Sequence, residues 1–265
     1  MTGRGRAASR RPIALHRSWF IDGELPLGAL CSVALGGLDP SEQNVDLPTT
    51  IVRLRLQVDT PFIAPDVSGE VVATCSATSV VRSVVHLEAA DGAGAATAEV
   101  DLGVRAPLVS RRPHPVLRAD DVLPYVGRRP GTASWFDVRP LPFTGDNVGT
   151  SEAWIRPRSV ANGALPGVLL ALDSWLPAFQ LDHARRLMAG VSQAEELPLA
   201  TLETATVYID LAHLSPSDER WLHLGMSVVD GPPGVVRERG ALRTEAEECI
   251  VWVEVDRRPG SDQTG

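Results

Sequence analysis

The sequence contains no lysine, so all 25 of its basic side chains are arginines. Its 33 acidic residues outnumber them, and the formal net charge is −8 at pH 7. A chain with this charge lacks the broad basic face that binding to nucleic-acid phosphates requires. We therefore exclude nucleic acid as the main partner, although clustered arginines can still hold a single phosphate in a bidentate geometry.

Cysteine is also scarce. Cys31, Cys75 and Cys249 are few, odd in number and far apart, so they indicate neither a disulfide framework nor a metal site. The six histidines show no metal-ligand spacing either. Phosphate-loop, dinucleotide-binding and G-x-S-x-G motifs are absent as well. We expect no metal and no cofactor.

Long hydrophobic runs are missing too. No stretch of about 18 apolar residues could cross a membrane. The arginine-rich start has no apolar run long enough for a signal peptide. Together with the cysteine usage, these absences predict a cytoplasmic protein without a membrane partner.

The chain does contain a proline-rich connector that separates two halves. Proline fixes φ and removes a backbone donor, so this segment cannot be a central strand. We expect a loose basic tail over residues 1–14, a first folded module over 15–104 and the connector over 105–130. A second folded module over 131–258 and a short tail over 259–265 follow.

Both halves have the same predicted order of elements: strand, apolar helix, then several strands. The segment Thr49–Asp59 alternates polar and apolar residues with a period of two, as a half-buried strand does. The two apolar segments are Leu25–Leu38 and Leu165–Phe179, each long enough for a helix. Further strands are predicted at 18–22, 71–78, 80–90, 95–103, 135–141, 152–156, 201–211, 221–229, 235–244 and 249–255.

A helix that is apolar on nearly all sides must be enclosed by other elements. The predicted fold class is therefore α+β, with two antiparallel sheets that each wrap around a central apolar helix. Two such modules side by side can cover each other's edge strands, which otherwise invite aggregation.

This order, together with several local sequences, resembles the double hot-dog acyl-CoA thioesterases of the TesB-like class, especially the thioesterase-like proteins of actinobacteria. The similarity covers about residues 15–257. It is carried by the segments Ser18–Leu30, Leu47–Phe62, Thr78–Gly92, Phe136–Pro142, Ala153–Arg158, Leu169–Ala178, Leu199–Ile209 and Arg220–Leu224. The resemblance implies an acyl-CoA or acyl-carrier-protein thioester as substrate and a homo-oligomer.

The family's catalytic water is held by an Asp on the second helix, a Thr or Ser at the start of the following strand, and a Gln on the last strand. Asp173 matches the Asp and is the one acid in an apolar segment, where an unpaired carboxylate is costly. Thr201 matches the hydroxyl residue. No Gln lies near the last strand, and Glu254 or Asp256 could take that position or face the solvent.

Three further residues are candidates for binding the substrate. Gly28 and Gly167 lie near the predicted helix starts, where backbone N–H groups can stabilise an oxyanion, although Gly28 is better explained by tight packing. Trp175 is a candidate for the pocket wall or the core. The segment Leu181–Pro198 is long enough to form a lid.

The predicted activity is thus thioester hydrolysis by a water that Asp173 and Thr201 activate. Two alternatives stay open: a hot-dog dehydratase, cyclase or isomerase acting on an acyl or polyketide-like substrate, and an acyl-binding protein without catalysis. A hot-dog dehydratase would need a His at a helix start, and neither predicted helix offers one.

Overall fold

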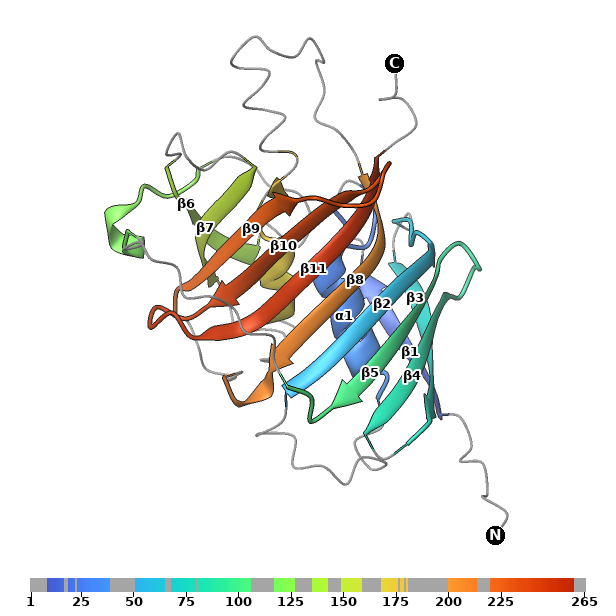
Figure 1. The fold of residues 1–265 in the computed structure, drawn as a ribbon. Coiled ribbons are helices and arrows are strands. Elements are labelled where there is room, and N and C mark those ends of the chain that lie inside the picture. The colour runs from blue at the N-terminus through green and yellow to red at the C-terminus, as the bar shows by residue number, and fades with distance from the viewer. Residues whose placement is uncertain are drawn as a thin grey trace.

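A computed structural model gives the fold of the chain (Figure 1). The structure describes residues 9–16, 19–21, 23–38, 51–64, 68–79, 81–105, 117–126, 135–142, 149–158, 168–175, 177–178, 180, 200–213 and 220–259.

The described strands form one continuous 11-stranded sheet in which every neighbouring pair is antiparallel. Its strand order is β1-β3-β4-β5-β2-β8-β11-β10-β9-β7-β6. The strands are β1 (Ser9–His16), β2 (Ile51–Thr60), β3 (Ser68–Ala77), β4 (Arg82–Ala89), β5 (Ala95–Leu102), β6 (Phe136–Pro140), β7 (Thr150–Pro157), β8 (Ala200–Asp210), β9 (Leu222–Val229), β10 (Val236–Arg243) and β11 (Cys249–Pro259).

The two halves of the chain meet at the β2–β8 pair in the middle of this sheet (Figure 1). The prediction of two separate sheets is therefore wrong, although the expected covering of edge strands is present. Val52, Leu54 and Leu56 of β2 are buried, and the polar residues between them face the other side, as the period-two pattern predicts. One hydrophobic core runs through both halves.

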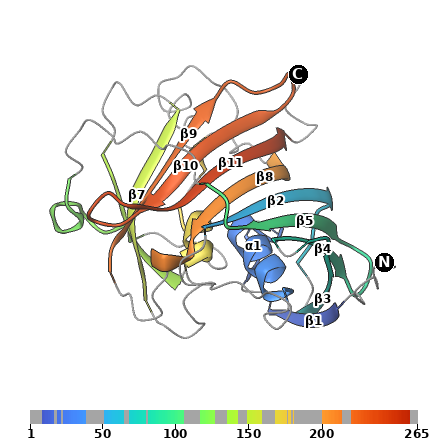
Figure 2. The same cartoon turned by 60° about the horizontal axis from the view of Figure 1, so that its bottom comes forward.

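The first half wraps around α1 (Leu27–Gly36), as the apolar segment predicts. Figure 2 shows β1, β3, β4, β5 and β2 curving around this helix. All residues from Leu27 to Ala34 are buried, so the helix has no solvent-facing stripe. Pro26 precedes the helix and makes no side-chain cap, which leaves the first N–H groups of the helix to be satisfied by other parts of the chain.

The second apolar segment differs from its prediction. Residues 168–170 are helical, and Ala171–Asp173 form a 3-10 turn. Ser174 and Trp175 form a bend, so the continuous helix expected over Leu165–Phe179 is interrupted there, and Ala178 and Gln180 are helical again. Residues 165–167, 176 and 179 lie outside the described part. The segment 168–173 contacts α1, and Leu169, Leu170, Ala171 and Leu172 are all buried in the core.

The first strand corrects the predicted tail. Residues Ser9–His16 form β1 and pair with β3 over their whole length. We placed most of this segment in a basic tail because its arginines obscure the alternation. Leu15 is nevertheless buried in the core, and Arg11 is anchored on the carbonyl of Gly36 at the end of α1.

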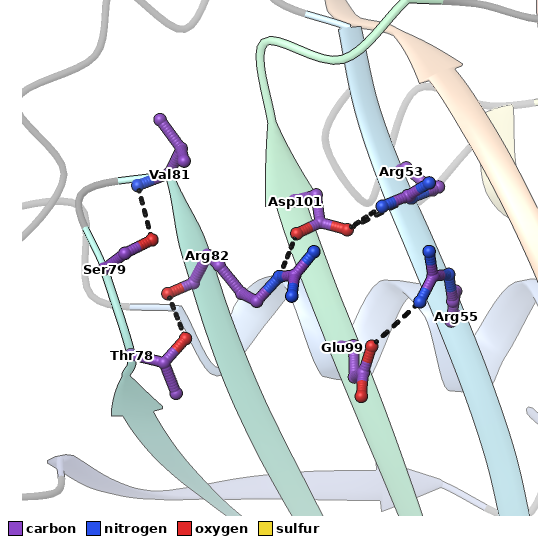
Figure 3. Close-up of polar contacts among 8 residues, drawn as sticks. All are labelled: Arg53, Arg55, Thr78, Ser79, Val81, Arg82, Glu99 and Asp101. Carbon is purple, nitrogen blue, oxygen red and sulfur yellow. Dashed lines mark hydrogen bonds and ion pairs between the residues drawn. The ribbon is translucent and has the colours of Figure 1, made fainter.

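The outer face of the first half carries a row of ion pairs across β4, β5 and β2 (Figure 3). Asp101 lies between Arg82 and Arg53, its direct neighbours on the two flanking strands, and bonds to both. Arg55 and Glu99 form a more exposed pair two residues along. Arg82 also accepts a hydrogen bond from Thr78 at its backbone carbonyl, so the turn from β3 to β4 is tied to this row.

Part of the predicted connector covers the outer face of the second half. Ala119 and Val122 pack on Trp154 and Trp221, which form a cluster separate from the main core. Arg139 donates to the carbonyl oxygen of Ala119 at 2.6 Å. No helix in the described parts of the chain is long and apolar enough to cross a membrane.

Candidate active site

The first turn of α1 and the segment at 168–173 touch at Gly28. A side chain at this position would place its Cβ 2.0 Å from the carbonyl oxygen of Leu169, so only glycine fits. The close approach brings the Asp173 carboxylate to the helix start, where the Gly28 N–H donates to Asp173 Oδ2 at 2.6 Å. Asp173 thus satisfies the helix end that Pro26 leaves without a side-chain cap.

This position sets the charge of Asp173. Burial raises its pKa to about 7, although the N–H groups of Gly28, Ala29 and Leu27 and the positive charge of Arg257 all act to lower it. A carboxyl group in this range gains and loses its proton near neutral pH, as a general base must. Taken as a whole residue, Asp173 is half-buried.

Thr201 lies at the same end of α1. It is the second residue of β8, and its hydroxyl donates to Oε1 of Glu24 at 3.3 Å. Glu24 precedes the helix and pairs in isolated bridges with Ile21 and Ile63, which fix the backbone there. The structure therefore places Asp173 against the first turn of α1, and Thr201 against Glu24 in the segment that leads into this helix.

The sequence analysis missed Arg257 and Glu238, an ion pair whose arginine acts to lower the pKa of Asp173 through its charge. Arg257 on β11 acts on the charge of Asp173, and its Nε lies 3.1 Å from Oε2 of Glu238 on β10. The Glu238 side chain is fully buried. A signal for Arg257 was available, because it continues the inward-facing alternation of Val251, Val253 and Val255. Nothing in the sequence singles out Glu24 or Glu238.

Glu254 and Asp256 lie on the other face of β11. Asp256 bonds to Arg237 through both carboxylate oxygens, at 2.6 and 2.7 Å, and Glu254 bonds to Arg239 at 2.5 Å. The hydrogen bonds from Arg237 hold the pKa of Asp256 below its ordinary value, with a further contribution from Thr204. The structure places neither acid beside Asp173, and the inward position of this strand holds an arginine.

The remaining candidates have other positions. The Gly28 N–H bonds to Asp173, which agrees with a packing and positioning role for this glycine. Trp175 is half-buried against the core and meets Tyr125 edge-on, with ring centroids 5.2 Å apart. Gly167 and the Leu181–Pro198 segment lie outside the described residues.

The thiol of Cys31 lies one turn along α1 from this end, but it is not a nucleophile of the site. Burial raises its pKa, and the negative charge of Asp173 raises it further. No group of three metal-ligating side chains occurs within the described ranges. The chemistry available at the start of α1 is thus proton transfer by the Asp173 carboxylate.

Three solved structures show which fold this is. The chain is similar to a hot-dog protein of unknown function from Alicyclobacillus acidocaldarius, with a TM-score of 0.70, 14% identity and 96% of each chain covered. A proposed thioesterase II from Thermobifida fusca has a TM-score of 0.67 and 12% identity over 98% of this chain and 99% of its own. The PpsC dehydratase domain from Mycobacterium tuberculosis, solved with C12:1-CoA, has a TM-score of 0.63 and 15% identity over 96% and 95%.

These likenesses show that the chain has the hot-dog fold. Neither a protein-family model nor a curated protein sequence matches it.

Proposed function

We propose that this protein hydrolyses acyl thioesters, with acyl-CoA or an acyl-carrier thioester as substrate. The observation that carries the proposal is the position of Asp173, a carboxylate with a pKa of about 7 that accepts the Gly28 N–H at the start of α1, while Thr201 bonds to Glu24 in the segment that leads into the same helix. Hot-dog structures that match nearly the whole chain include a proposed thioesterase and a domain solved with an acyl-CoA. Their acyl-thioester chemistry supports the substrate class.

We further propose that the sheet consists of two fused hot-dog modules that meet at β2–β8. The helix of the second module would then begin at the segment 168–173. In this arrangement the site lies between the modules, because α1 belongs to the first and Asp173, Thr201 and Arg257 belong to the second.

In the proposed mechanism, α1 fixes one carboxylate oxygen of Asp173 through the Gly28 N–H. The other oxygen, Oδ1, takes a proton from a water molecule, which Thr201 holds with its hydroxyl oxygen. That oxygen can accept because the Thr201 proton is directed at Glu24. The water oxygen attacks the thioester carbonyl, the carbon–sulfur bond breaks, and the thiolate receives the proton that Asp173 had taken.

The test is thiol release from a panel of acyl-CoA substrates. We expect Asp173→Asn to lower kcat/KM by 100-fold or more, on the scale of a lost general base. The Asn side-chain oxygen can still accept the Gly28 N–H, so the fold should persist. The wild-type rate should rise with pH and level off above about 7, as Asp173 loses its proton.

Asp120→Asn is the matched control, because it makes the same change of carboxylate to amide at a residue of the connector whose side chain is 90% exposed. It should leave kcat/KM unchanged. Undiminished hydrolysis by Asp173→Asn, or no hydrolysis of any thioester by the wild type, would contradict the proposal.

A dehydratase on the same scaffold is the second candidate, favoured by the likeness to the PpsC domain. The contacts of two described histidines, His86 and His223, give it little support. His86 on β4 contacts Thr97 on the exposed outer face of the sheet. His223 on β9 is buried against Trp154, 3.6 Å from Glu152, in the outer cluster of the second half.

A further inference from the structure

The described part of the connector, residues 117–126, forms a strap that is fixed to the outer face of the second half. The carbonyl oxygen of Leu117 accepts the indole N–H of Trp154 on β7 at 2.6 Å. The carbonyl oxygen of Ala119 accepts a hydrogen bond from Arg139 on β6, also at 2.6 Å. The Ala119 side chain is buried in the outer cluster of this half. The first part of the strap is therefore anchored on β6 and β7.

The strap then reaches the other side of β6, which ends the order of strands in the described sheet. The Tyr125 N–H donates to the carbonyl oxygen of Val138 on β6 at 2.8 Å. The Tyr125 ring meets the ring of Trp175 edge-on, with 5.2 Å between the centroids. Trp175 packs against the main core, which is separate from the outer cluster. The strap thus links the outer face of the second half to the segment that carries Asp173.

Trp175 depends on packing for its orientation. Its indole Nε1 is buried and has no hydrogen-bond partner in the parts of the chain that the structure describes. A buried indole N–H usually bonds to an acceptor, which would fix the ring. An edge-to-face contact between two rings also has a preferred geometry. The contact with Tyr125 therefore supplies the orientation that no hydrogen bond of the indole provides.

A short turn connects Trp175 to the acid. Ser174 donates twice to the carbonyl oxygen of Ala171, from its N–H at 3.2 Å and from its hydroxyl at 2.6 Å. Ser174 is 0% exposed, so both bonds are buried. Asp173 lies within this turn, and its Oδ2 accepts the Gly28 N–H of α1 at 2.6 Å. A displacement of the Trp175 ring would therefore move the turn and lengthen the bond to Gly28.

We propose that Tyr125 is a positioning residue of the candidate site, because its ring holds Trp175 and thereby holds Asp173 against the start of α1. The connector is then part of the site as well as the link between the halves. The catalytic meaning of this role rests on the proposed function, but the position of Asp173 can be measured without any substrate.

The test is hydrogen exchange of the Gly28 amide, followed by NMR. This N–H lies in the first turn of α1, where no intrahelical acceptor exists, so its protection depends on Asp173. Tyr125→Leu removes the ring and should speed the exchange about 10-fold or more, as a local opening does. Tyr125→Phe keeps the ring and should exchange like the wild type. Asp173→Ala removes the acceptor and gives the upper limit of the effect.

Two controls distinguish positioning from a general loss of stability. The Leu30 N–H donates to the carbonyl oxygen of Pro26 in the same helix, so its exchange should stay unchanged in Tyr125→Leu. Val126→Ala shortens a neighbouring side chain at a residue that is 94% exposed, and Gly28 should exchange as in the wild type.

Unchanged exchange of Gly28 in Tyr125→Leu would overturn the proposal. Acceleration in Tyr125→Phe or in Val126→Ala would do the same, since the ring contact is intact in both. An equal acceleration of Gly28 and Leu30 in Tyr125→Leu would show a general loss of stability and overturn it too.

Activity gives a separate measurement. Tyr125→Leu should lower kcat about 10-fold and leave KM within about twofold of the wild type, because a small displacement of the acid affects the reaction more than binding. Tyr125→Phe should keep the wild-type kcat, and a raised KM with an unchanged kcat in Tyr125→Leu would contradict a role in positioning Asp173. Faster exchange of Gly28 in Tyr125→Leu, without thioesterase activity in the wild type, would contradict the proposed function and leave the positioning role of Tyr125 standing.

Discussion

At the scale of single residues, Asp173 combines two roles that a carboxylate can fill together. It accepts the Gly28 N–H at the start of α1, a position where the helix dipole favours negative charge. Its burial nevertheless raises its pKa to about 7. The balance of these effects produces a group that is held in a fixed orientation and is still able to exchange a proton.

Gly28 makes this arrangement possible, and its replacement should disrupt it. In Gly28→Ala the new methyl group would lie 2.0 Å from the Leu169 carbonyl oxygen and 2.8 Å from Asp173 Oδ2. We expect a loss of about 2 kcal/mol or more in the free energy of unfolding, on the scale of overpacked cores. Chemical denaturation measures this loss, and the rate of thiol release should fall as well.

Gly36→Ala is the control in the same helix. The nearest atom to its Cβ is 3.9 Å away, and alanine favours helix over glycine, so stability should stay the same or rise slightly. Equal stabilities of the two variants would show that α1 moves freely away from the segment 168–173, against the packing described above.

At the scale of elements, strand alternation explains where charges lie. On β11 it turns Glu254 and Asp256 outward toward arginines and Arg257 inward toward Glu238. A register shift between Asp256 and Arg257 in the pairing with β8 places Thr201 opposite Arg258. The end of β8 that carries the candidate hydroxyl is therefore positioned by an irregularity in the ladder.

The row of ion pairs on β2, β4 and β5 allows a test of how charged side chains stabilise this part of the sheet. Burial raises the pKa of Asp101, but the hydrogen bonds from Arg82 and Arg53 outweigh it and hold the pKa below its ordinary value of 3.8. The pKa is lowered by folding, so the stabilisation is present above 3.8 and is lost as the pH falls through the folded-state value.

Asp101→Asn should therefore destabilise the protein at neutral pH, by about 1–2 kcal/mol. The difference from the wild type should shrink as the pH falls below about 4, and thermal unfolding across this range would follow it. Glu99→Gln removes a carboxylate from the exposed pair with Arg55 and should change little. A difference for Asp101→Asn that persists undiminished at pH 2 would contradict this explanation.

At the scale of the whole molecule, the β2–β8 pair joins the halves into one sheet with a continuous core. β2 and β8 are therefore both interior strands of the sheet. Separation of the halves would expose unpaired backbone N–H and C=O groups along β2, which is a long strand in the middle of the sheet.

A fragment of residues 1–104 should therefore self-associate or unfold, whereas the full chain should unfold in one cooperative transition. Light scattering and circular dichroism at matched concentrations distinguish these outcomes. A monomeric fragment with a cooperative transition would show that the first half does not depend on β8.

The sequence predicted most elements well. Ten of the eleven predicted strands and α1 lie close to their expected positions, because alternation and apolar runs are local properties of the chain. The strand predicted at 18–22 is wrong, since Ile21 forms only an isolated bridge. β1 was missed because its arginines and Pro12 obscure the alternation, while pairing with β3 supplies the order. The continuous helix over Leu165–Phe179 was expected from composition alone, and the described part is broken by the 3-10 turn at Ala171–Asp173 and the bend that follows it.

For the candidate site, the sequence by itself determined the unusual acid, Asp173, and the start of a strand at Thr201. Only the tertiary structure decided which groups surround them: Gly28 and Glu24 from the first half, and Arg257 with Glu238 from the far strands. The reason is physical. Periodicity assigns a side chain to a face of its own strand, whereas its neighbours depend on strand order, register and bulges, which arise from contacts between residues far apart in the chain.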